Sequence, residues 1–227
     1  LQSLLSSSVP VAAQQEALHD MLDSFHNIVT SLQQASGGGS PSIGSAAAVF
    51  RLSKAVLAAA GSCQGGQVFS GATLGAWEAA LAGSLSELKP WVGTEASPVG
   101  ACPRRLLAMA ALNFCSAGGI AVRAATAAGF DALDRFPMPN LINAMVVCVG
   151  NLHPSFVCQL LRFGAEPPQD AMPVVRAVVA AVEAAVEVIL SAAGGSLDIV
   201  SESMTMVACS GIPALIGELV CMQPVLL

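Results

Sequence analysis

The sequence predicts an all-α protein of short stacked helices, and three observations lead to this fold class. Apolar residues make up 54% of the 227-residue chain, yet no run alternates apolar and polar residues as a half-buried strand would. Helical stretches are interrupted throughout by 21 Gly and 13 Pro. Blocks of small residues around a Gly recur at intervals of about 40 residues, which is typical of helical repeat proteins.

The first 35 residues are expected to form an amphipathic helix, over residues 11–34. Its apolar side chains recur at spacings of three and four, which places them on one face. They are Leu18, Met21, Leu22, Phe25, Ile28, Val29 and Leu32. His19, Asp23 and His26 share the polar side, but zinc normally requires a third and fourth ligand, so we interpret them as solvated residues.

Two further segments complete the expected organisation. Residues 36–44 are rich in Gly and Ser and predict a flexible linker. Residues 45–227 then form the helical-repeat part of the chain. The helices expected there are 45–60, 74–88, 104–116, 120–128, 131–135, 140–149, 154–163, 172–192, 199–207 and 213–220. Gly and Pro mark the turns between them, and the Gly118-Gly119 pair is one such turn signal.

One stretch near the end of the chain carries a family signature. Residues 209–220 read Cys-Ser-Gly-Ile-Pro-Ala-Leu-Ile-Gly-Glu-Leu-Val and closely resemble the armadillo repeat, in which a small-small-Gly-Ile-Pro-x-Leu turn introduces a helix. The segments around Asn113 and Asn151 resemble the Ala-Leu-x-Asn-Leu ending of the third armadillo helix. The resemblance implies an α-solenoid of armadillo or HEAT-like repeats that binds other proteins.

Four residues are candidates for protein binding. In armadillo proteins the third-helix Asn lines a concave groove, and this resemblance assigns Asn113 and Asn151 to such a groove. Met109 and Val147 stand where a Trp usually precedes that Asn, so the alternative is that each Asn braces its own helix end. Trp77 and Trp91 are hot-spot residue types and either anchor a partner or pack in the core. For the two Asn and for the two Trp, both alternatives remain open.

Composition excludes several other functions. The net charge is −6 with only nine Lys and Arg, which disfavours DNA and bulk RNA as partners. No catalytic motif, phosphate-binding loop or metal-ligand spacing is present, so we expect no enzyme, no cofactor and no metal. The seven Cys form no CxxC motif and predict free thiols in a reducing compartment. They are Cys63, Cys102, Cys115, Cys148, Cys158, Cys209 and Cys221.

The expected function is a non-enzymatic scaffold or structural subunit of a large assembly. Only 11% of the residues are charged, so an isolated chain would expose apolar surface that neighbouring proteins are expected to cover. The Ala- and Gly-rich composition is typical of a GC-rich genome such as that of a green alga. On this basis we expect an intracellular protein of the cytoplasm or cytoskeleton, associated with the microtubules of the ciliary axoneme. The chain begins at Leu1, which predicts a processed or partial sequence.

Two alternatives stay open. Residues 133–136 and 140–144 resemble the octotricopeptide class, which implies an RNA-binding protein of an organelle, although the acidic balance opposes it. A membrane-embedded subunit is the other alternative, because residues 106–122 are uncharged. That run is shorter than the roughly 20 apolar residues of a membrane-spanning helix, and the chain contains no Tyr for an interfacial belt.

Overall fold

The computed structural model describes residues 42–62, 71–92, 102–127, 138–152 and 171–193, together with single positions between 13 and 30. Every element in these ranges is helical and none of them is a strand, which confirms the all-α class. The elements are α2 (Ile43–Ser62), α3 (Gly71–Leu88), the 3-10 helix η1 (Lys89–Trp91), α4 (Cys102–Ala127), α5 (Pro139–Gly150) and α7 (Ala171–Ala193).

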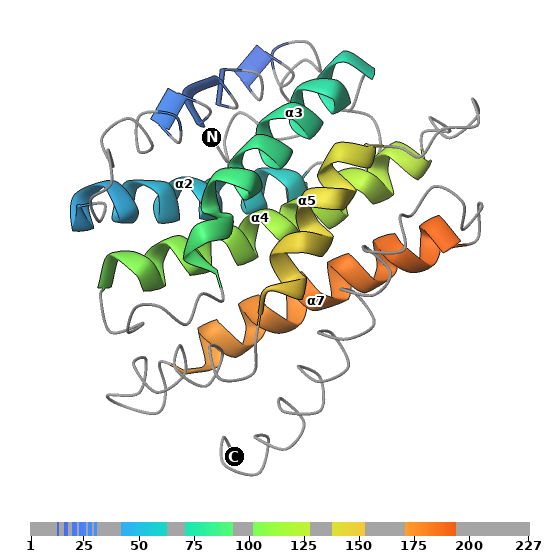
Figure 1. Ribbon diagram of the computed structural model, residues 1–227. Helices are drawn as coiled ribbons and strands as arrows, with labels where there is room; N and C mark the ends of the chain where they lie inside the picture. The colour runs from blue at the N-terminus through green and yellow to red at the C-terminus, as the bar shows by residue number, and fades with distance from the viewer. Residues whose placement is uncertain are drawn as a thin grey trace.

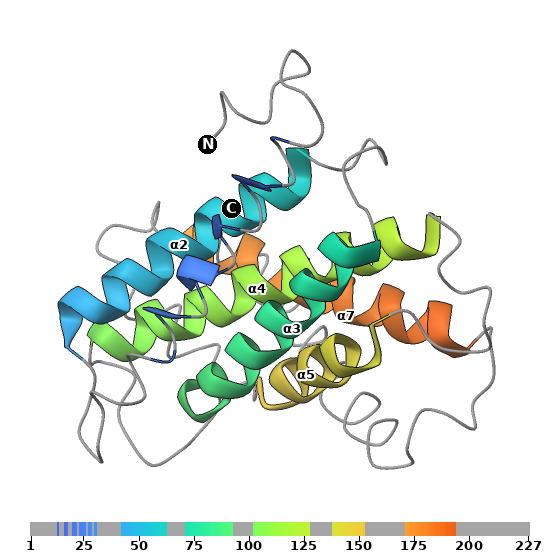
Figure 2. The same cartoon turned by 90° about the horizontal axis from the view of Figure 1, so that it is seen from above.

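The helices form two layers around α4 (Figures 1 and 2). In one layer α2 and α7 flank α4 on opposite sides, and in the other α3 packs beside α5. The central helix contacts all four of these helices. Its residues from Leu107 to Gly119 are buried on every side, as a helix that is apolar around its whole circumference requires.

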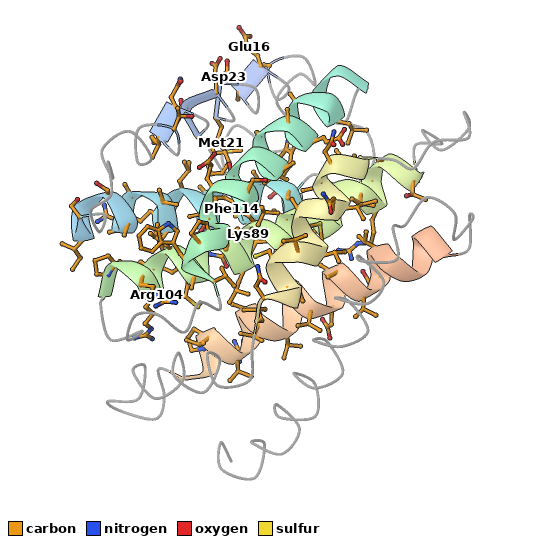
Figure 3. The ribbon with its side chains drawn as sticks, in the orientation of Figure 1. Glu16, Met21, Asp23, Lys89, Arg104 and Phe114 are labelled. Atoms are coloured by element: carbon orange, nitrogen blue, oxygen red, sulfur yellow. The ribbon has the colours of Figure 1, made fainter. Side chains whose placement is uncertain are left out.

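The N-terminal helical positions belong to the same core. Phe25 is fully buried and its ring meets that of Phe114 on α4 edge-on, with 4.5 Å between the ring centroids. Met21, one turn earlier, is also buried, whereas Glu16 and Asp23 lie on the outer side of this segment (Figure 3). Among its described positions, the predicted apolar face therefore docks on α4 through Phe25, and Met21 is also buried, while Ile28 stays 37% exposed.

Two helix starts are stabilised by different means. At α2, the Ser42 Oγ accepts a hydrogen bond from the Ser45 backbone N–H at 3.1 Å, which is an N-cap within the chain. At α5, the residue before the helix is Met138, whose φ of 57° is left-handed and whose side chain makes no cap hydrogen bond. The Glu78 Oε1 of α3 instead accepts a hydrogen bond from the Asn140 backbone N–H at 3.0 Å. The first turn of α5 is thus capped by another helix.

The sequence interpretation of Gly118-Gly119 as a turn is wrong, because α4 runs through both residues without a break. A Cβ at Gly118 would lie 2.7 Å from the Met145 Sδ of α5. A Cβ at Gly119 would lie 2.5 Å from the Cβ and 3.2 Å from the Cα of Ala184 on α7. The two glycines therefore serve close helix packing rather than chain reversal.

A solenoid of armadillo repeats is not confirmed by the described helices. In a solenoid each repeat contacts its neighbours only, whereas α4 contacts four helices that precede and follow it. Asn113, expected at the end of a repeat, lies in the middle of α4. The signature at 209–220 lies outside the described residues, as do the helices expected at 131–135, 154–163, 199–207 and 213–220.

We expect Gly119→Ala to destabilise the fold. Ala is favoured over Gly in a helix by about 1 kcal/mol, but overpacking against the Ala184 backbone costs about 1–3 kcal/mol and requires α7 to move away. Equilibrium unfolding in urea measures the difference.

The matched controls are Gly75→Ala and Gly83→Ala on α3, where a new Cβ meets nothing within 4 Å. Both should raise the free energy of unfolding by about 0.4–1 kcal/mol. If Gly119→Ala were stabilising like the controls, the tight contact between α4 and α7 would be refuted.

Candidate protein-binding surface

The two tryptophans lie at different depths. Trp77 on α3 has an exposed fraction of 0% and is the largest fully buried side chain among the described residues. Trp91 on η1 is half-buried and packs against the same core. Trp77 therefore has a packing role in this structure, and of the two only Trp91 keeps surface that a partner could reach.

Asn113 is 7% exposed and ties two helices together. Its Nδ2 donates to the Oγ of Ser53 on α2 at 2.9 Å, and this Oγ in turn donates to the Phe50 carbonyl at 2.8 Å. The chain of two hydrogen bonds satisfies polar groups in an otherwise apolar contact between α2 and α4. Asn113 thus acts as a brace inside the core.

Asn151 is half-buried at the end of α5. Its backbone N–H donates to the carbonyls of Val147 at 3.2 Å and Cys148 at 3.3 Å, which closes the last helical turn. The structure does not bring Asn113, Asn151, Trp77 and Trp91 together into one groove. A binding role for them stays a prediction from the sequence.

Charged and metal-ligating groups are sparse in the described ranges. These ranges contain no group of three or more His, Cys, Asp or Glu that could hold a metal ion. Asp23 is exposed, and its predicted neighbours His19 and His26 lie outside the described residues. Arg104 is 4% exposed at the start of α4, and its burial lowers the pKa of the guanidinium.

The outer face of α2 is an exposed surface that the sequence predictions did not single out. We define it as the exposed residues Gly44, Ala48, Arg51, Lys54, Ala58 and Ser62, which follow one another at spacings of three and four. The opposite side is buried at Ala46, Val49, Ser53, Val56 and Ala59, and Ser53 on this side accepts the hydrogen bond from Asn113 of α4. Ile43, at the first turn of α2, is 58% exposed.

The only charges on α2 are basic. The helix contains Arg51 and Lys54 and no Asp or Glu, in a chain whose net charge is −6. The Lys54 Nζ lies 5.8 Å from the centroid of the Phe50 ring, so the side chain lies along the helix over an aromatic face. The outer face of α2 therefore combines small side chains with a local positive charge.

Among the described helices, two, α2 and α4, are long and apolar enough to cross a membrane by length and composition alone. The 18-residue apolar window of α4 is 83% buried inside the protein, as expected of a core helix. The corresponding window of α2 is only 33% buried. Of the two helices, α2 is therefore the less buried, although Ile43 is its only exposed large apolar side chain.

We expect Ser53→Ala to lower the free energy of unfolding by about 1–3 kcal/mol, because the buried Asn113 amide loses its hydrogen-bond acceptor. The control is Ser62→Ala, which removes an exposed hydroxyl bonded to the Ala58 carbonyl and should change stability by less than about 0.5 kcal/mol. Denaturant unfolding of both variants, and of the double variant Ser53→Ala/Asn113→Leu, measures how much the hydrogen bond between Asn113 and Ser53 contributes to the free energy of unfolding. Equal effects of the two serine variants would contradict it.

Searches with the chain found no matching family model, no matching curated protein and no matching solved structure.

Proposed function

We propose that the chain is a non-enzymatic subunit that binds another protein through the outer face of α2. The observation that supports this most is that one face of α2 is exposed along the length of the helix, from Gly44 to Ser62, and that the only charged residues of the helix, Arg51 and Lys54, are basic. The exposed apolar groups on this helix, the Ile43 side chain and the methyl groups of Ala48 and Ala58, favour association, because burial of apolar surface contributes about 25 cal/mol per Å².

The composition of the face indicates what kind of partner fits. Gly44, Ala48 and Ala58 carry little or no side chain, so the backbone of a second helix can approach α2 closely. Arg51 and Lys54 lie among these small residues. The partner that complements this surface is a helix with an aliphatic stripe and acidic residues beside it.

The armadillo-like repeat fold stays a proposal drawn from the sequence. Its strongest support is the sequence signature at 209–220, outside the described residues. The scaffold function, the large assembly and the cytoskeletal or ciliary setting are likewise proposals drawn from the sequence. The role of α2 does not depend on them.

The experiment is site-specific photo-crosslinking in extract of the source cells. A photoreactive phenylalanine analogue placed at Ala58 should yield a cross-linked protein, with the cross-link mapped to a helical segment bearing Asp or Glu. The double charge reversal Arg51→Glu/Lys54→Glu should reduce the yield about tenfold, because like charges across an interface are strongly unfavourable.

The matched control places the same analogue at Glu183, an exposed position on α7 on the other side of α4. It should not capture the same protein. Three results would overturn the proposal: a native mass equal to that of the monomer, a yield unaffected by charge reversal, or retention in membranes after carbonate extraction. The last result would instead favour the membrane subunit.

A further inference from the structure

The contact between α4 and α5 contains two cysteines that meet inside the core. Cys115 of α4 and Cys148 of α5 have exposed fractions of 0% and 1%, and both thiols are free. The Cys148 side chain lies near enough to Cys115 to raise the pKa of its thiol.

The packing of the next turn fixes this pairing. Gly118, three residues after Cys115, lies against Met145 and Leu141 of α5. Met145 comes three residues before Cys148. Because α4 and α5 run in opposite directions (Figure 1), a step forward along α4 corresponds to a step backward along α5. The alignment of the two helices that brings Met145 against Gly118 therefore also places Cys115 opposite Cys148.

We propose that Cys115 and Cys148 are a site of reversible oxidation, at which a peroxide converts the two thiols into a disulfide that links α4 to α5. In the first step one sulfur attacks a peroxide oxygen, the O–O bond breaks, and a sulfenic acid and one water form. In the second step the other sulfur attacks the sulfenic sulfur, the S–S bond forms, and a second water leaves. Two electrons pass from the thiols to the peroxide, and the two thiol protons end in the waters.

The surroundings favour this product and set its rate. A disulfide is neutral and suits an apolar core, whereas a buried thiolate carries an uncompensated charge. The neighbouring Cys148 side chain and burial raise the pKa of the Cys115 thiol. The reactive thiolate is therefore scarce at neutral pH, and its fraction rises about tenfold per pH unit below the pKa. The rate of oxidation should be low near pH 7 and should rise with pH in proportion to the thiolate fraction.

The experiment is hydrogen peroxide treatment of the folded 227-residue chain, followed by alkylation, digestion with trypsin without reductant and mass spectrometry. Cleavage at Arg and Lys releases residues 106–123, which contain Cys115 alone, and residues 136–162, which contain Cys148 and Cys158. We expect these peptides to appear joined through Cys115 and Cys148. The cross-link should raise the melting temperature by about 6–12 °C, and reductant should reverse the rise.

Cys148→Ser should abolish both the joined peptide and the thermal shift, whereas Cys158→Ser on the same peptide should leave both unchanged. If a variant fails to fold, the peptide map of the unsubstituted chain still tests whether Cys115 and Cys148 form the disulfide. Alkylated, unlinked Cys115 after peroxide treatment would overturn the proposal, as would a link from Cys115 to any cysteine other than Cys148.

Discussion

The close approach of α5 and α7 to α4 is the constraint on which the described packing depends. Gly118 and Gly119 are adjacent in sequence and face different neighbours, because consecutive helix positions differ by about 100° around the axis. Two helices can thus reach the α4 backbone at the same level. Buried alanines on α7, among them Ala181 and Ala185, keep this distance short. A core of such small side chains gains less from each residue than one of Leu or Phe, so its stability depends on tight contact along whole helices.

Polar side chains fit into this dense core because they find partners close by. The hydroxyl of Ser84 donates to the Ala80 carbonyl at 2.6 Å, and that of Ser116 to the Leu112 carbonyl at 3.1 Å, each one turn earlier in the same helix. Asn113 reaches across to another helix instead. Local bonding leaves packing between helices unchanged, whereas the bond between Asn113 and Ser53 specifies how α2 and α4 align.

Within the described ranges, the sequence located most helices correctly but did not predict how they pack against one another. The expected helices 74–88 and 140–149 agree with α3 and α5 to within three residues at each end, because Pro and Gly mark their boundaries. Gly118-Gly119 misled the prediction, since a glycine that permits a turn and one that permits close packing look alike in a single sequence. Burial of Trp77 and Asn113 depends on which helices meet, and periodicity does not determine that. The outer face of α2 was not predicted either, because its exposure depends on which side of the helix packs on α4.

The hydrogen bond between Glu78 and the Asn140 backbone has a consequence for how the chain acquires its structure. A helix of 12 residues is marginal in isolation, and α5 has no side-chain cap of its own at Met138. Its first turn gains the missing acceptor only once α3 is in place beside it. Nucleation of α5 is therefore coupled to tertiary assembly, and α3 and α5 are expected to fold and open as one cooperative unit whose amide protons exchange together.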